Sequence, residues 1–206
     1  MKNAIVLVWI VSTVFITGID YAQTGWIPLQ INSSSVSGYN LYATETELYA
    51  ATGSGIYSTG NNGTSWTLKG LTDSGNWVCD VIKSNQYILA ATRFGIYRSS
   101  NNGTNWSATN LTSTISARGG TLGSHMFAKN STYLFFIQWA VGVFRSGDDG
   151  LNWEQVFVGQ YAPGYPDYAS TASSLGVIGE KIILGLNSGT ANNFYISSDN
   201  SRPFIF

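Results

Sequence analysis

Short apolar segments alternate with polar turns along most of the chain. Residues 48–52 and 55–58 form one such pair of segments, and residues 87–92 and 95–99 form a second. β-Branched and aromatic residues fill these segments and Gly or Asn bounds them, which is typical of β-strands. Because no segment shows sustained helical periodicity, the pattern predicts an all-β protein.

A polar phrase follows each pair of segments and recurs along the chain. Its pattern is Ser or Thr, any residue, Asp or Asn, any residue, Gly, any two residues and Trp. A degenerate copy lies near the C-terminus. The first two copies begin at residues 59 and 99, so they are offset by 40 residues. A fixed period of this size indicates a propeller or a solenoid. The positions of the pattern are occupied by Thr59, Asn61, Gly63, Trp66, Ser99, Asn101, Gly103, Trp106, Ser146, Asp148, Gly150, Trp153, Ser197 and Asp199.

Each repeat has room for about four strands, as the blades of a β-propeller do. In the second repeat we expect an inner strand at residues 77–83, further strands at 87–92 and 95–99, and an outer strand that starts near Asn105. The third and fourth repeats are less regular. The sequence therefore predicts a β-propeller of four-stranded antiparallel blades, with about four blades in this chain.

The repeated phrase has the chemistry of a structural turn. Asn and Asp side chains bond the backbone one or two residues further on, and Gly adopts a positive φ without steric cost. A Ser or Thr hydroxyl at the first position adds a further bond to the turn. The Trp then packs as a large apolar plate, so we expect these residues to build blades and not a binding site.

This pattern resembles the Asp-box, or BNR repeat, of sialidase-like β-propellers, over roughly residues 24–204. The amino-acid sequence of the strands is most similar to that of the photosystem II stability/assembly factor-like proteins in this group. The resemblance implies that the box is a hairpin away from the usual ligand face. Two departures are notable: Asn61 and Asn101 stand where the family prefers Asp, and Ser201 and Phe204 replace the Gly and Trp of the fourth copy.

The resemblance also bears on completeness. Propellers of this family usually have six or more blades, so we expect this chain to be a fragment of a longer propeller. The alternative is a small closed ring, in which a strand at residues 26–29 completes the last blade across the termini.

Residues 1–22 have the features of a secretory signal peptide. Lys2 supplies the positive charge, residues 4–16 form the apolar run, and Ala22 is a plausible cleavage point. The alternative is a single membrane anchor, but this run is shorter than the ~20 residues that a spanning helix needs. We therefore expect a secreted, periplasmic or cell-surface protein, with the propeller in residues 23–206 and no membrane span after cleavage.

Composition excludes several partners and cofactors. The net charge is −1 and only 10% of the residues are charged, so the basic patch that a nucleic-acid partner requires is not expected. Cys79 is the only cysteine and His125 the only histidine. We therefore expect no disulfide, no metal site and no cofactor, with Cys79 as a buried strand thiol.

The catalytic set of a sialidase is not recognisable in this sequence. The resemblance implies an arginine triad, a Tyr nucleophile with a Glu partner and an acidic group, but the Phe/Tyr-Arg-Ile-Pro motif is missing. Arg98 and Arg145 recur just before the box, which indicates a structural or surface role, and Arg93 and Arg118 are the free candidates. Glycoside hydrolysis needs two carboxylates. Asp80, on a predicted inner strand, is the strongest candidate for a catalytic carboxylate. The other carboxylates considered are Asp73, Glu154, Asp167 and Glu180.

Aromatic residues outside the box are the remaining lead. Tyr161, Tyr165 and Tyr168 lie in the longest irregular segment, and long loops tend to be functional, so they form the predicted ligand surface. Trp77 and Trp139 are either exposed for binding or packed between blades. We expect an exported, non-catalytic binding or assembly scaffold for a protein or a glycan. The alternatives are a sialidase-like glycoside hydrolase fragment and a surface adhesin without a defined small ligand.

Overall fold

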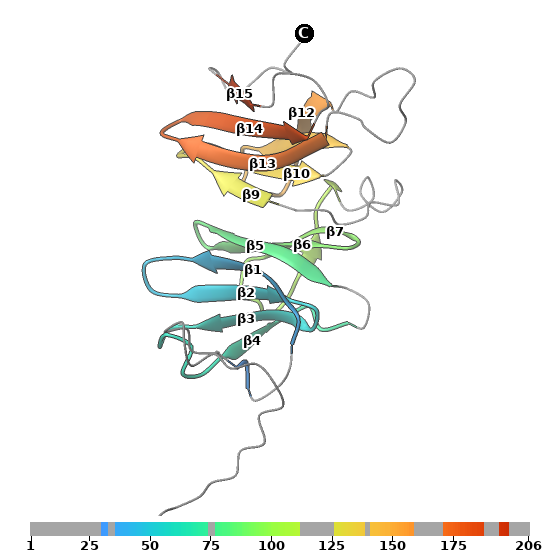
Figure 1. The fold of residues 1–206 in the computed structure, drawn as a ribbon. Helices are drawn as coiled ribbons and strands as arrows, with labels where there is room; N and C mark the ends of the chain where they lie inside the picture. Colours follow the sequence, from blue (N-terminus) through green and yellow to red (C-terminus); the bar gives the residue numbers. More distant parts are fainter. Residues whose placement is uncertain are drawn as a thin grey trace, which may run out of the picture.

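The chain folds into β-sheets that follow one another in sequence order (Figure 1). The computed structural model describes residues 30–32, 36–73, 77–111, 126–138, 141–158, 171–187 and 194–197. Within these residues there are four antiparallel sheets, three of four strands and one of three. In each sheet the strands lie in chain order, as consecutive hairpins.

The strands of each sheet are as follows. The first sheet contains β1 (Gly38–Ala43), β2 (Leu48–Thr52), β3 (Gly55–Thr59) and β4 (Thr67–Gly70). The second contains β5 (Val78–Ser84), β6 (Tyr87–Thr92), β7 (Gly95–Ser99) and β8 (Ser107–Ala108). The third contains β9 (Met126–Lys129), β10 (Leu134–Gln138), β11 (Gly142–Ser146) and β12 (Glu154–Val158). The last contains β13 (Thr171–Ile178), β14 (Lys181–Asn187) and β15 (Phe194–Ser197).

These sheets are four blades of a β-propeller, which confirms the predicted fold class. The expected bounds of the second blade are nearly those observed. The strands predicted at 87–92 and 95–99 are β6 and β7, and the inner strand β5 begins at Val78, one residue later than expected. The outer strand β8 begins at Ser107, because Asn105 still belongs to the turn, where its backbone N–H donates to the Asn101 side chain.

Apolar side chains fill the space between neighbouring sheets. Successive residues of a strand point to opposite faces, so Ile88 packs on the first sheet while Leu89 packs on the third. Fully burying one such side chain stabilises the fold by about 1.5–3 kcal/mol. The cluster between the second and third sheets includes Leu89, Ile96, Phe136, Phe144 and Trp153.

The recurring polar sequence, each copy of which we call a box, forms a network of hydrogen bonds. In the second blade, the Ser99 hydroxyl donates to Asn101 Oδ1 (3.0 Å) and accepts from the backbone N–H of Gly103 (2.9 Å). Asn102 and Gly103 both have positive φ, at 56° and 87°, which reverses the chain between the strands. The hydroxyls of Thr59 and Ser146 make the equivalent bonds in the first and third blades.

The boxes of the second and third blades also hold their blade against the preceding one. The indole N–H of Trp106 donates to the carbonyl oxygen of Lys69 in β4 (2.9 Å) and to that of Gly103 (3.1 Å). A side chain at Gly103 would collide with Lys69, so the turn needs Gly for close approach as well as for φ. In the third blade the backbone of Trp153 exchanges two hydrogen bonds with the side chain of Asn110 (2.9 and 3.1 Å).

Several expectations from the sequence fall outside the described residues. They concern the signal peptide at 1–22, the strand at 26–29, and Asp199 of the fourth copy of the phrase. In the described part of the chain, no helix has the length and hydrophobicity that crossing a membrane requires.

Replacing the box hydroxyl should destabilise the fold. In Ser99→Ala the buried N–H of Gly103 loses its acceptor, so we expect the free energy of unfolding to fall by about 1–3 kcal/mol. Chemical denaturation followed by tryptophan fluorescence measures this change. Ser107→Ala, which truncates an exposed serine in the same blade, is the control. Equal stability of Ser99→Ala and this control would contradict a structural role for the hydroxyl.

Candidate functional site

Asp80, the carboxylate singled out from the sequence, joins three blades. Its side chain is buried on the inner strand β5. Oδ1 accepts from the Asn40 amide in β1 and from the N–H of Val81, and Oδ2 accepts from the N–H of Phe127 in β9, all at 2.7 Å. Burial raises the pKa of Asp80 to about 7. The carboxyl group therefore bonds to its own protein and does not face a substrate.

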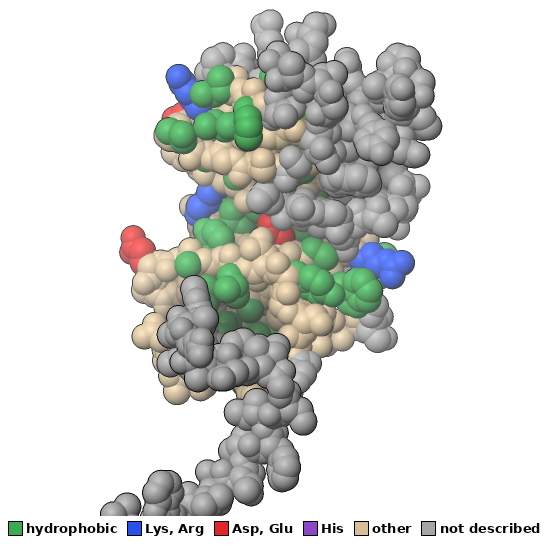
Figure 2. Space-filling view, viewed as in Figure 1, with side chains coloured by type: hydrophobic (Ala, Val, Ile, Leu, Met, Phe, Trp, Pro, Cys, Tyr) green, Lys and Arg blue, Asp and Glu red, His purple; other side chains and the backbone are tan. Residues whose placement is uncertain are grey.

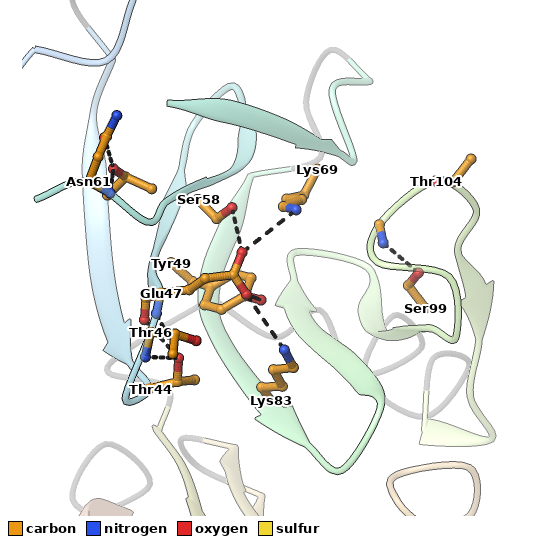
Figure 3. A network of polar contacts seen from close by, with 12 residues as sticks. Thr44, Thr46, Glu47, Tyr49, Ser58, Asn61, Lys69, Lys83, Ser99 and Thr104 are labelled. Atoms are coloured by element: carbon orange, nitrogen blue, oxygen red, sulfur yellow. Dashed lines mark hydrogen bonds and ion pairs between the residues drawn. The ribbon is translucent and has the colours of Figure 1, made fainter. Parts of the chain in front are cut away.

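Glu47 is held in a second network, between the first two blades (Figure 3). The phenol of Tyr49 donates to Glu47 Oε2 (2.6 Å), and the ammonium groups of Lys83 and Lys69 lie 3.6 and 4.0 Å from its oxygens. The hydrogen bond from Tyr49 and the two lysines lower the pKa of Glu47. Burial and this carboxylate raise the pKa of Tyr49. The phenol thus stays protonated, which is the reverse of what a Tyr nucleophile with a Glu partner needs.

Two further acidic side chains, those of Asp148 and Glu154, make contacts within their own blade. Asp148 accepts hydrogen bonds from Ser146 and Asn152 within its box. Glu154 pairs with Arg145. Asp73 and Glu180 are exposed, and Asp167 lies outside the described residues.

A polar cleft of about 300 Å³ lies between the second and third blades. The β5–β6 turn, the β9–β10 turn and the box of the third blade line it. Asp149 crosses between the blades here, since its Oδ1 accepts from Ser84 (2.8 Å) and from Asn85 (2.7 Å). These two hydrogen bonds join neighbouring blades through residues that line the cleft.

A group of exposed aromatic residues lies beside one arginine at the β6–β7 turn, at the other end of the strands from the polar cleft. We call Tyr39, Trp77, Arg93 and Phe94 the aromatic–arginine cluster. The guanidinium carbon of Arg93 lies 6.0 Å from the ring centres of both Trp77 and Phe94, within cation–π range. The ring of Tyr39 stacks on that of Trp77 at 6.5 Å. The three aromatic side chains are 42–49% exposed, so Trp77 is not packed between blades.

Backbone bonds fix the cluster to the second blade. The N–H of Arg93 donates to the carbonyl oxygen of Trp77 (3.2 Å), which ties the β6–β7 turn to the entry of β5. Thr92 Oγ1 accepts from the N–H of Phe94 and donates to the carbonyl oxygen of Gly95, both at 3.1 Å. The cluster therefore stands on a rigid turn, as a pre-organised binding surface requires.

The cluster lies at the end of the blades away from the box turns. Strands in each sheet are antiparallel, so the β2–β3 and β6–β7 turns emerge at one end and the boxes at the other (Figure 1). Figure 2 shows hydrophobic side chains beside a basic one on this side of the second blade. The predicted ligand residues Tyr161, Tyr165 and Tyr168 fall between β12 and β13, outside the described residues.

Gln138 is a further residue at this end of the sheets. Its side chain is 1% exposed, and neither amide atom has a hydrogen-bond partner in the part of the chain that the structure describes. Thr52 and Thr92, at the same repeat position, instead bond within their turns. Buried unpaired polar groups are rare and call for an explanation. The signal in the sequence was the change from Ala-Thr at 51–52 and 91–92 to Ile-Gln at 137–138.

The remaining candidates have structural environments or fall outside the described residues. The guanidinium of Arg98 lies 3.4 Å from the ring centre of Tyr87, and that of Arg145 lies 4.5 Å from that of Tyr133. Cys79 is half-buried and not fully buried as predicted, since its thiol points along the backbone to the carbonyl of Trp77. Burial raises the pKa of Cys79 to about 11, which keeps the thiol protonated. Arg118, His125 and Trp139 fall outside the described residues.

No metal centre is formed by the blades. Among the described residues, no group of three or more His, Cys, Asp or Glu side chains could hold a metal ion.

Comparisons with known proteins relate the chain to others by fold. No protein-family model matches it, and no curated protein matches its sequence. Its structure is similar to that of YCF48 bound to D1 peptide (TM-score 0.57, 15% identity), covering 85% of this chain and 56% of that one. YCF48 from Cyanidioschyzon merolae has a TM-score of 0.55 and 16% identity, with 81% and 55% covered. The chain thus spans about half the length of the YCF48 chains that it matches.

A designed protein is also similar in structure. The computationally designed Ika4 protein matches with a TM-score of 0.52 and 10% identity, covering 84% of this chain and 98% of that one. At these sequence identities, the similarity shows a shared fold alone.

The raised pKa of Asp80 should make stability depend on pH. The folded protein retains a proton on Asp80 up to about pH 7, while an unfolded Asp releases it near pH 4. The free energy of unfolding should therefore decrease as the pH rises from 4 to 7, by about 1.4 kcal/mol for each unit of the pKa shift. Denaturation across this range, compared with Asp80→Asn, measures the contribution.

In Asp80→Asn this part of the pH dependence should disappear. Asp73→Asn removes an exposed carboxylate and is the control, which should follow the unmodified protein. Parallel stability–pH curves for the unmodified protein and Asp80→Asn would contradict the role of Asp80.

Proposed function

We propose that this chain is a non-catalytic β-propeller scaffold that binds a partner through the aromatic–arginine cluster. The observation that carries the proposal is the exposure of Tyr39, Trp77 and Phe94 around Arg93 on a rigid turn. Tyr, Trp and Arg are the residues most enriched in the energetic centres of protein interfaces. This composition favours a protein or peptide partner over a glycan.

The electrostatics of the cluster indicate the chemistry of that partner. The guanidinium carbon of Arg93 lies 6.0 Å from the centres of two aromatic rings, and the guanidinium has no carboxylate partner among the described residues. A guanidinium held in this way pairs with a carboxylate in bidentate geometry. We infer that the partner presents an acidic group beside an apolar side chain.

The fold supports this proposal. YCF48, whose structure was solved bound to D1 peptide, has the same type of fold, so propellers of this architecture bind peptides. We further propose that the recurring turns are Asp-boxes and that residues 1–22 direct export. The scaffold would then act outside the cytoplasm.

The structural use of the acidic side chains supports a role without catalysis. Asp80 and Glu47 are enclosed by donors from their own protein. Glycoside hydrolysis instead needs two carboxylates placed on either side of a scissile bond.

A peptide selection tests the proposal. A phage library of random linear peptides is selected on the purified protein and depleted on the variant Trp77→Ala. We expect enriched peptides that contain Asp or Glu and an apolar residue. Their affinity should fall about thirtyfold or more in Trp77→Ala and in Arg93→Ala, since loss of an interface centre costs about 2 kcal/mol or more.

Leu151→Ala is the matched control, because Leu151 is as exposed as Trp77 (48% against 47%) but lies in the box turn of the third blade. A glycan array read for binding, followed by assay of the bound glycans for hydrolysis products, covers the other possibilities. Glycan binding that depends on Trp77 without any peptide would assign a glycan partner instead. Released product would contradict a non-catalytic role.

A further inference from the structure

The inner contacts of the stack repeat at equivalent positions in successive blades. The strand register pairs Ala51 with Ile56 in the first blade and Ala91 with Ile96 in the second. Ile137 pairs with Val143 in the third blade. All three second members are buried, at 0%, 0% and 4% exposed, on the face that each blade turns to the next one. Each blade therefore carries a forward face that needs a following blade.

In the part of the chain that the structure describes, no sheet lies against this forward face of the last sheet. By register, Gly185 pairs with Phe194, so Phe194 occupies the position of Ile56, Ile96 and Val143. Yet Phe194 is 75% exposed. Ile183 and Ile196 pair directly on the same face, and Ile196 is also largely exposed.

Figure 2 shows hydrophobic side chains gathered over the β13–β14 hairpin of this sheet. Apolar groups that are exposed together in this way mark interaction sites. The face is thus built as an interface between blades and has no described blade against it.

Among the described residues, no sheet lies against the complementary backward face of the first sheet. Leu41 pairs with Ala50, as Val81 pairs with Ala90 in the second blade. Val81 is buried against the first blade at 1% exposed, whereas Leu41 is 62% exposed. Leu68, in the outer strand of the same sheet, is also exposed.

The box tryptophan of the first blade, Trp66, has a polar group without a partner in the described part of the chain, on the same side of the sheet. Trp106 donates its indole N–H to the outer strand of the preceding blade. Trp66, its counterpart, is buried, but its indole N–H has no hydrogen-bond partner among the described residues. Trp153, the counterpart in the third blade, donates its indole N–H to the carbonyl oxygen of Gly150 in its own box. Among the described box tryptophans, Trp66 is therefore the one whose indole N–H has no partner.

We propose that a second copy of this chain docks on these faces, so that the backward face of one copy packs on the forward face of the other. The two faces are the two halves of one contact, which the chain already makes between its own successive blades. They lie at opposite ends of the stack (Figure 1), so one copy cannot join its own faces in this arrangement. A second copy presents the matching half.

Such a contact is heterologous, because different surfaces of the two copies meet. Heterologous contacts form rings when the rotation closes and open chains when it does not. Two copies, with four described sheets in each, bring eight described sheets together, and natural propellers have about four to eight blades. A closed dimer is therefore the expected assembly.

The mass in solution, measured by sedimentation equilibrium over a concentration series, tests the proposal. We expect a dimer of the unmodified protein. Leu41→Glu on the backward face and Phe194→Glu on the forward face should each give a monomer with unchanged circular dichroism, because both side chains are exposed. Leu151→Glu, at an exposed position away from both faces, is the control and should remain dimeric.

Mixing the two variants distinguishes the head-to-tail contact from a symmetric one. The Phe194→Glu variant keeps an intact backward face and the Leu41→Glu variant an intact forward face. Their mixture should therefore form a heterodimer, detected by native mass spectrometry, although each variant alone is monomeric. A monomeric unmodified protein, a dimer that survives Leu41→Glu, or a mixture that stays monomeric would each overturn the proposal.

Discussion

The docking of each box on the blade before it is the interaction on which the rest of the structure depends. A β-sheet that is apolar on both faces is not stable alone, since each uncovered face leaves hydrocarbon in water. In the second blade one turn provides this cover: the Ser99 hydroxyl closes the hairpin, Gly103 permits contact between backbones, and Trp106 donates to the outer strand of the preceding blade. The repeat is therefore a device for stacking sheets.

The two ends of the strands differ in the kind of side chain that they carry. The hairpins and boxes at one end carry polar groups that bond to one another across blades, as Asp149 does with Ser84 and Asn85. At the opposite end, the β6–β7 turn and the entry of β5 carry the exposed aromatic–arginine cluster. Binding surfaces on propellers form where turns vary over a constant frame, because loops tolerate changes that strands do not.

The fold could be predicted because its sequence repeats. The candidate site could be predicted only in part, because its residues lie outside the repeated pattern. Strands β6 and β7 were predicted at their observed bounds because a 40-residue period placed them twice. Trp77 and Arg93 were recognised as candidates, but their contact was not, since it depends on the backbone bond between the β6–β7 turn and the entry of β5. Tyr39 and Phe94 were missed, because single aromatic residues beside strands resemble core residues in sequence.

Asp80 shows why residue type alone does not identify chemistry. An acidic residue on an inner propeller strand is where a catalytic carboxylate is expected, and its pKa near 7 would suit an acid or a base. The donors around it decide otherwise: Asn40 and Phe127 come from the two neighbouring blades and occupy both oxygens. The same burial that perturbs the pKa removes the group from any substrate. A perturbed carboxyl in this fold therefore marks the junction of blades, and chemistry has to be sought at the exposed turns.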